Sequence, residues 1–353
     1  MSLPIITDLV TANPGRFYPQ AEAAEKYISR LPDKRRARAV HAIFNKTGVG
    51  SRYSVGDEIF YSQPRSTQER NDKYMEAAVP FGEETLQKLF AQSEYTPQDI
   101  DDFMVVSCTG YSIPGLDLHL AGRLGMRNDL RRTCILGMGC YGSFPGLRRA
   151  SESVSSGHNR VALVLSLELC SLHLQFDTSA ETAVSAGLFA DGAAAAIVSM
   201  DNPPASEKTM PRLMNFKTQC DYQTLDEMSF TVSDTGFRMY LSSYVPDVLA
   251  ANVEAFVDDL LADCHLTRDQ IAHWGIHPGS TKIVDYVADN LDLTYEQVDV
   301  AHQVLHDYGN MSSATILFVL NQIQQTKQPQ TGDYGVLMAF GPGLTIEGAL
   351  VQW

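Results

Sequence analysis

Several patterns that would indicate a particular kind of partner are missing from this sequence. Lysine and arginine together number 27 against 42 aspartates and glutamates, so the formal net charge is −15. Because nucleic-acid binding depends on clustered cations, we expect no nucleic-acid partner. No apolar run approaches the roughly 20 residues of a membrane span, and the first residues lack the basic start and long apolar stretch of a signal peptide. We therefore expect a cytoplasmic protein without a membrane partner.

Paired cysteines are missing as well. None of the six forms a C-x-x-C pair or shows a zinc-ligand spacing: Cys108, Cys134, Cys140, Cys170, Cys220 and Cys264. Most lie in apolar runs, which is typical of reduced core residues, so we expect free thiols and no catalytic metal. What the sequence does have is an ordinary globular composition, 44% apolar and 20% charged over 353 residues. Such a chain can bury a large core, as two domains or as two fused halves.

One glycine-rich stretch, residues 136–146, organises the interpretation. A short apolar run at 133–136 predicts a strand, and apolar residues at helical spacing over 144–154 predict a helix. Cys140 therefore lies at a strand-to-helix corner, flanked by Gly137, Gly139 and Gly142, which allow a tight bend. The partial positive charge of a helix N-terminus favours a thiolate. A buried structural cysteine is the alternative at this stage.

The remaining pattern predicts a mixed α/β chain. We expect short helical pieces and loops over residues 1–68, helices at 69–92 and 116–124, and strands at 103–107, 160–169 and 193–200. A capping threonine and a proline at 96–97 indicate a helix start. The segment 201–208 has the composition of a linker.

The second part of the chain repeats the first. An amphipathic helix at 246–264 is followed by a capping box at Thr267 and a strand at 272–276. When Thr267 is set against Thr96, Asn310 falls within one position of Cys140, again shortly before an apolar helix, at 314–323. We therefore expect two related βαβ halves, residues 1–205 and 206–353, packed as layers of helix and sheet.

A third group is needed beside these two corners, and His277 is the candidate. It leaves the strand at 272–276 at the sheet edge where ligands collect, and a Pro-Gly turn follows it. A cysteine nucleophile needs an imidazole nearby, and an asparagine amide beside that imidazole would stabilise an oxyanion. A cysteine protease also uses Cys, His and Asn, but no Q-x-x-x-x-x-C-W run is present.

Four motifs together resemble the type III polyketide synthases, the chalcone- and pyrone-forming branch of the thiolase-fold condensing enzymes. They are G-C-Y-G around Cys140, H-P-G from His277, Y-G-N-M-S-S-A around Asn310, and F-G-P-G-L-T-I-E over 340–347. L-F-A-D-G-A, over 188–193, resembles the family's L-F-G-D-G-A. The resemblance implies a thiolase-like fold, with the duplicated halves forming an αβαβα sandwich.

The resemblance also implies an activity. Cys140 would carry the starter acyl group, while His277 and Asn310 would hold the malonyl thioester carbonyl and stabilise the enolate left by decarboxylation. The product would be a polyketide that cyclises to a pyrone or resorcinol. No cofactor is implied, because the substrates are carried as coenzyme A or acyl-carrier-protein thioesters.

The family is homodimeric, and Ile113 matches the residue that reaches into the partner's cavity. Phe189 resembles the gatekeeping aromatic, with an ordinary core phenylalanine as the alternative, and Gly343 belongs to a Gly-Pro-Gly wall.

Some positions depart from the family pattern. Of the basic residues expected for the coenzyme A phosphates only Lys46 is present, since the other two positions are Ala39 and Ala42. The nearby Lys34-Arg35-Arg36-Arg38 could compensate, receive an acidic carrier protein, or be a solvated helix face. His173 replaces a small hydroxylic cavity residue and could narrow the cavity or be structural, and Met239 replaces a cavity aromatic.

Three alternatives to the iterative malonyl-extending enzyme stay open. A stand-alone ketosynthase would join two β-ketoacyl chains held on carrier proteins into an α-pyrone, which fits the weak coenzyme A charges. An inactive scaffold would only bind acyl chains or a synthase partner, and a thiol hydrolase would release acid instead of a ketide.

Overall fold

The computed structural model describes residues 2–177, 179–200, 209–225, 227–241 and 245–353. The linker expected at 201–208 lies outside these ranges. Nine strands form one sheet in the order β11-β12-β13-β8-β1-β7-β6-β4-β5. Its centre is weak, because β1 (Ile5–Ala12) and β8 (Arg212–Cys220) pair through one residue couple, Ile5 with Arg212. The sheet is therefore best described as two strand groups that meet at β1 and β8.

The two groups share a pattern of strand directions. In the first, β1, β7 (Asp191–Ser199) and β6 (Val161–Leu169) are antiparallel neighbours, and β4 (Asp102–Val106) runs parallel to β6. In the second, β8, β13 (Thr345–Gln352) and β12 (Tyr334–Gly341) are antiparallel neighbours, and β11 (Ile271–Ile276) runs parallel to β12. The edge strand β5 (Arg131–Ile135) extends only the first group. This likeness supports the expected duplication, although the boundary at residue 205 stays a prediction.

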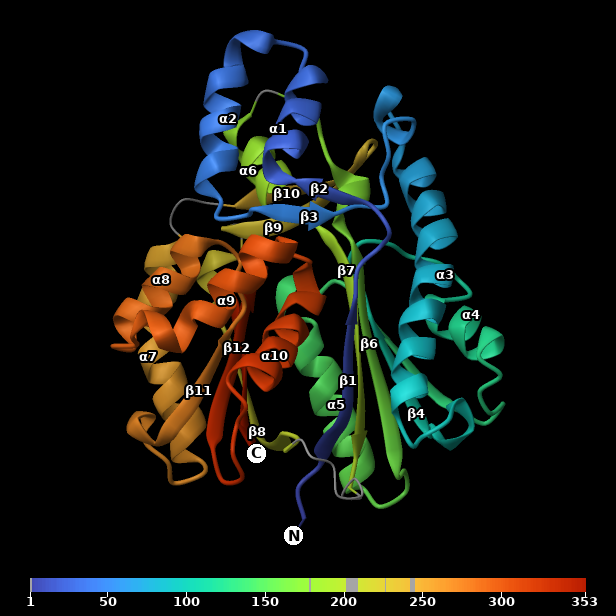
Figure 1. Ribbon diagram of the computed structural model, residues 1–353, viewed down its shortest axis with the longest axis vertical. Helices are drawn as coiled ribbons and strands as arrows, with labels where there is room; N and C mark the ends of the chain where they lie inside the picture. The colour runs from blue at the N-terminus through green and yellow to red at the C-terminus, as the bar shows by residue number, and fades with distance from the viewer. Residues whose placement is uncertain (1, 178, 201–208, 226, 242–244) are drawn as a thin grey trace.

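Helices separate and cover the two groups in five layers (Figure 1). Helices α5 (Ser143–Ser155) and α10 (Thr315–Thr326) lie between them, α3 (Thr67–Gln92) and α4 (Leu116–Arg123) cover the first group, and α7 (Val245–Ala262) and α8 (Thr281–Asn290) cover the second. The αβαβα sandwich expected from the motifs is therefore confirmed.

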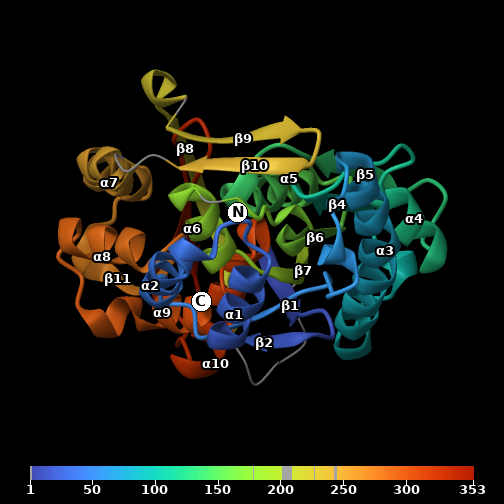
Figure 2. The ribbon, with the colours of Figure 1, turned by 90° about the horizontal axis from the view of Figure 1, so that it is seen from above.

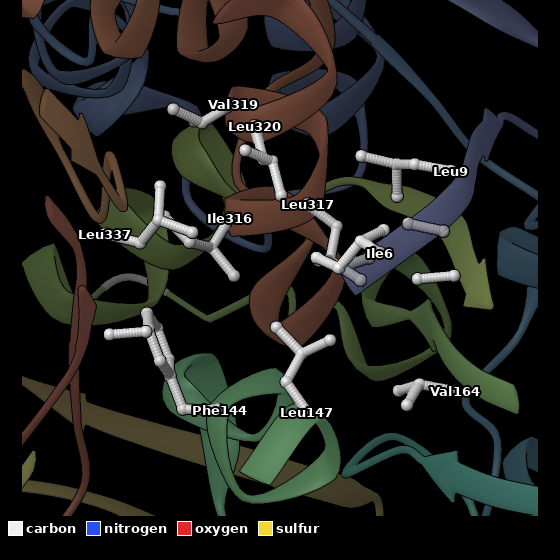
Figure 3. Packing of buried hydrophobic residues seen from close by; sticks show 14 of the residues in the cluster. Ile6, Leu9, Phe144, Leu147, Val164, Ile316, Leu317, Val319, Leu320 and Leu337 are labelled. Atoms are coloured by element: carbon white, nitrogen blue, oxygen red, sulfur yellow. The ribbon is translucent and has the colours of Figure 1, made fainter. Parts of the chain in front are cut away.

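The central layer is closed by apolar side chains from both strand groups (Figure 3). Alternate residues of each strand face opposite layers: Val164 packs toward α5 and α10, whereas Leu163 and Leu165 pack toward α3 and α4. Strands buried on both faces read as continuous apolar runs, which is why β6 was visible in the sequence. Each fully buried Leu or Ile of this layer contributes roughly 1.5–3 kcal/mol.

Further helices and a hairpin surround one end of the sandwich. They include α1 (Gln20–Ser29), α2 (Ala37–Lys46), α6 (Ala180–Leu188) and α9 (Tyr295–Tyr308). The hairpin of β9 (Met228–Ser233) and β10 (Gly236–Leu241) runs along one side of the molecule, and β2 (Phe17–Pro19) lies near the opposite side (Figure 2).

The expectation of only helical pieces and loops over residues 1–68 is wrong. β1 is a central strand, and β2 pairs with β3 (Ser51–Tyr53). The apolar alternation of β1 is broken by a register shift between Ile6 and Asp8, so its period-2 signal is lost. The helix start expected at Thr96 is a single 3₁₀ turn, Pro97–Asp99, because the strand β4 begins three residues later.

Candidate active site

Cys140 occupies the strand-to-helix corner that the sequence predicts. β5 ends at Ile135, a 3₁₀ turn spans Gly139–Tyr141, and α5 begins at Ser143. The φ angles of Gly137 and Gly139 are +72° and +69°, which non-glycine residues rarely adopt. A Cβ on Gly139 would also lie 2.7 Å from Cδ of Pro342. Glycine is therefore required at 139 for both conformation and space, and it leaves the Cys140 side chain 7% exposed.

Asn310 lies between two helices, so the expectation of a strand-to-helix corner equivalent to that of Cys140 is wrong for the segment before it. α9 ends at Tyr308, Gly309 turns the chain with φ +73°, and a 3₁₀ turn, Ser312–Ala314, leads into α10. The Asn310 amide is fixed at both ends: Oδ1 accepts from the Ser312 N–H at 2.8 Å, and Nδ2 donates to the Gly279 carbonyl at 3.4 Å. Both corners thus combine a 3₁₀ turn with a central helix.

His277 follows the last residue of β11. Its main-chain N–H donates to the Met338 carbonyl at 2.8 Å, so the pairing with β12 continues to this residue. The ring is 1% exposed, and both of its nitrogens lack a hydrogen-bond partner among the described residues. A Cβ on Gly279 would lie 3.8 Å from Cδ2 of this ring, and Gly279 is the residue whose carbonyl accepts from Asn310. The imidazole and the carboxamide therefore both lie beside Gly279.

Burial governs the ionisation of this site. It raises the pKa of Cys140 to about 11, against hydrogen bonds from the side chains of Ser312 and Asn310, which lower it. It lowers the pKa of His277 to about 3. The thiol and the imidazole are therefore both neutral near pH 7. The bias of a helix N-terminus toward thiolate, expected from the sequence, is outweighed by burial in the unliganded protein.

Two neighbours of the site were missed from the sequence. Ser312 lowers the pKa of Cys140, and its Oγ lies 3.3 Å from the Sγ of Cys108. Glu168 is fully buried and accepts from the Cys108 N–H, the Thr109 hydroxyl and the Ser313 hydroxyl. A signal for Glu168 was present, since it is the one charged residue inside the apolar run that forms β6.

Two cavities adjoin the corner. One, of about 450 Å³, is lined by Gly139, Gly343, Cys108, Phe230 and Phe237 among others. The other, of about 50 Å³, is lined by Phe189, His173 and Met239 and shares Cys108, Phe230 and Phe237 with the first. The Phe189 ring stands edge to face with Phe230, with centroids 6.3 Å apart.

His173 borders the smaller cavity without offering it a free polar atom. Nε2 donates to the Thr109 carbonyl at 2.7 Å, and Nδ1 accepts from the Phe237 N–H at 3.1 Å. The ring stacks on Phe237 at 4.2 Å, and burial lowers its pKa to about 4, so it is neutral. Of the two expectations for this residue, these contacts favour the structural role.

Two predicted residues line neither of these cavities. Ile113 is 82% exposed and lines a third hollow of about 230 Å³ at the β5 edge, which shares Tyr111 and Leu136 with the larger cavity. Lys46 is an exposed residue in the last turn of α2 and lines neither cavity beside Cys140.

Comparison with known proteins identifies the family. Residues 19–228 match the model "FAE1/Type III polyketide synthase-like protein", and residues 218–353 match "Chalcone and stilbene synthases, C-terminal domain". The chain is 30% identical to the 1,3,6,8-tetrahydroxynaphthalene synthase of Streptomyces peucetius over 97% of its own length and 91% of that protein.

The chain belongs to the type III polyketide synthases. It is also 35% identical to the 3,5-dihydroxyphenylacetyl-CoA synthase of Amycolatopsis orientalis, over 80% of this chain and 76% of that one. The crystal structure of PKS-I from the brown alga Ectocarpus siliculosus superimposes with a TM-score of 0.92 and 27% identity, covering 99% of this chain and 98% of that one. This polyketide synthase is thus a thiolase-fold acyltransferase that acts on acyl thioesters.

Two further findings concern membrane spans and metal sites. Within the described ranges, no helix is long and apolar enough to cross a bilayer. The same part of the chain contains no cluster of three or more His, Cys, Asp or Glu side chains that could hold a metal ion.

Proposed function

We propose that Cys140, His277 and Asn310 perform a decarboxylative Claisen condensation that builds a cyclising polyketide. The observation that carries the proposal is the closeness of the two corners: the Asn310 side chain lowers the pKa of the Cys140 thiol, and its Nδ2 donates to the Gly279 carbonyl beside the His277 ring. A nucleophile and two donors around one point are what acyl transfer through an oxyanion requires.

The reaction begins with acyl transfer. Cys140 attacks the starter thioester, a new thioester to its sulfur forms, and the carrier thiol leaves with the proton that Cys140 gives up. Because the free thiol is neutral, this proton loss accompanies attack and does not precede binding.

Carbon–carbon bond formation follows from decarboxylation. A malonyl thioester loses carbon dioxide, and the electron pair passes to an enolate whose oxygen accepts from Asn310 Nδ2 and from one N–H of His277. A neutral imidazole carries one N–H, so the low pKa of His277 is compatible with this role. The enolate carbon then attacks the acyl carbon, the bond to the Cys140 sulfur breaks, and the chain is two carbons longer.

Substrate delivery is the second part of the proposal. From the family we expect mainly coenzyme A thioesters as substrates, with Lys46 contacting one of the coenzyme A phosphates. Two exposed cations support a carrier protein as the other delivery route: Arg38 in the first turn of α2, and Arg35 in the preceding 3₁₀ turn, where it pairs with Asp33. The small cavity beside His173 supports a short chain, which keeps a ketosynthase that joins two carrier-bound chains into an α-pyrone as the second candidate.

We also propose a homodimer. Ile113, Tyr111 and Leu136 are large apolar residues exposed together near the unpaired edge strand β5. Such an exposed group next to a free edge is typical of an interface. An inactive scaffold is disfavoured because all three reactive groups are present.

Product analysis tests this function. The enzyme is incubated with malonyl thioester and a panel of acyl starters, each supplied both as coenzyme A and as carrier-protein thioester. We expect pyrone or resorcinol products whose masses show the addition of two carbons for each extender used. Cys140→Ala serves as the control and should form no product. Free acids alone would show a thiol hydrolase, and the absence of any product or adduct with every thioester would show a scaffold.

A further inference from the structure

A buried arginine outside the cavities holds the backbone on which Asn310 is placed. Arg52, on β3, is 6% exposed, and its guanidinium reaches the C-terminal end of α6. Nη1 donates to the carbonyls of Ala186 and Phe189 at 2.6 and 2.7 Å, and Nη2 donates to the carbonyl of Gly187. The last carbonyls of a helix have no partner inside the helix, so this cation supplies most of what the end of α6 needs.

The same helix end is completed by Asn310. Its main-chain N–H donates to the Leu188 carbonyl at 2.9 Å, and its carbonyl accepts from the Ala190 N–H at 2.9 Å. Arg52 and the Asn310 backbone therefore both bond peptide groups of one segment, residues 186–190. This segment also carries Phe189 into the cavity wall.

The space beside Gly309, the residue before Asn310, is also bounded by Arg52. A Cβ on Gly309 would lie 3.0 Å from the Ala190 Cβ and 3.8 Å from the Arg52 Cβ. Gly309 thus fits between the arginine and the segment that the arginine holds, and a shift of either one would move the turn that precedes Asn310.

The partners of Arg52 show that it is held for position rather than for ion pairing. Gln20, itself buried, accepts from Nη2 and donates from Nε2 to the Gly187 carbonyl at 2.9 Å. The other groups bonded to the guanidinium are main-chain carbonyls. Burial lowers the pKa of Arg52 to about 10, so the group stays charged near pH 7. The planar guanidinium of an arginine carries five N–H donors and can bond several carbonyls at once. A lysine ammonium has three donors and cannot reproduce this planar arrangement.

We propose that Arg52 is a positioning residue for condensation: by clamping segment 186–190 it fixes the Asn310 carboxamide at the enolate oxygen and Phe189 at the cavity wall. The inference rests on the proposed role of Asn310. It assigns no contact between Arg52 and the substrate.

The test is a double-mutant cycle read out as malonyl-thioester decarboxylation. We expect Arg52→Met to lower the decarboxylation rate about 10- to 100-fold, because misplacement of a catalytic group by about 1 Å costs that much. In the Asn310→Ala background the same change should lower the rate less than about 3-fold, since there is no amide left to misplace. Acylation of Cys140 by a starter thioester should stay within about 3-fold of wild type, a split that a general loss of folded protein would not produce.

Arg70→Met is the matched control. Arg70 is equally buried and also donates to main-chain carbonyls, those of Leu172 and Leu174, but it does not touch segment 186–190. Arg70→Met should change the decarboxylation rate by the same factor in the wild-type and in the Asn310→Ala background. Arg52→Lys keeps the charge without the fork and should recover part of the lost rate. If Arg52→Met does not fold, Arg52→Lys and Gln20→Met take its place in the cycle.

The outcomes separate the two claims. If Arg52→Met slows decarboxylation by the same factor in both backgrounds, or does not slow it, the positioning role is overturned while the proposed function stands. If Asn310→Ala alone keeps the wild-type rate, the proposed function itself is contradicted.

Discussion

The Cys140 and Asn310 corners use the same backbone device for different chemistry. Each follows a turn with a positive-φ glycine, enters a 3₁₀ turn and opens a central helix. The cysteine corner continues a paired strand, β5, whereas the asparagine corner has no such strand and pairs instead with residues 188–190. The comparison teaches that the same glycine and 3₁₀ turn can follow either a strand or a helix, so the different roles proposed for the two corners rest on their side chains.

The largest expected effect comes from removing either side chain. Cys140→Ala should abolish starter adducts and condensation but leave malonyl decarboxylation, because the two donors remain. Asn310→Ala should keep starter acylation and slow decarboxylation about 10²–10³-fold, the usual cost of one oxyanion donor. Adduct mass and carbon dioxide release measure the two activities. Equal loss of both activities in both variants would contradict the division of roles.

The second prediction concerns ionisation. Since burial raises the pKa of Cys140 to about 11, its alkylation by iodoacetamide should rise about tenfold per pH unit from 8 to 10 without levelling near 9. Since the pKa of His277 is lowered to about 3, the decarboxylation rate constant should be flat between pH 5 and 8. A fall in that rate below pH 6.5 would show an imidazole that charges at its ordinary value.

The third prediction tests the space at the cysteine corner. Gly139→Ala and Gly125→Ala both place alanine at a φ near +65°, which costs about 1–2 kcal/mol. Only position 139 meets another atom, Cδ of Pro342, so Gly139→Ala should cost about 1–3 kcal/mol more. Urea unfolding compares the two. Equal losses would mean that the corner has more room than the structure shows.

The smallest effect concerns the repeated capping boxes. Thr96 and Thr267 each cap a 3₁₀ turn with an acidic or amide residue three positions on, Asp99 and Gln270. Thr96→Ala and Thr267→Ala should each lower the unfolding free energy by about 1 kcal/mol. Chemical unfolding measures both variants. If only one of them loses unfolding free energy, the two capping boxes do not stabilise the two halves equally.

What the sequence could predict follows from how local each signal is. The corners at Cys140 and Asn310 were visible because a glycine-rich turn and an apolar helix lie side by side in the chain. The strand β1 was not, because a register shift breaks its period and its partners, β7 and β8, lie about 190 residues or more away. Arg52 and Ser312 gave no signal, since their roles depend on backbone groups brought close only by the fold.

The central claim is that the acyl group on Cys140 is attacked by the enolate held at His277 and Asn310. A chase experiment on the wild-type enzyme tests it most directly. The protein is first acylated with a labelled starter, excess thioester is removed, and malonyl thioester is added while the mass of the Cys140 peptide is followed. The account predicts that the adduct disappears at the rate at which carbon dioxide is released, with the label recovered in a chain two carbons longer. An adduct that persists while carbon dioxide is released, or a label recovered only as the starter acid, would contradict it.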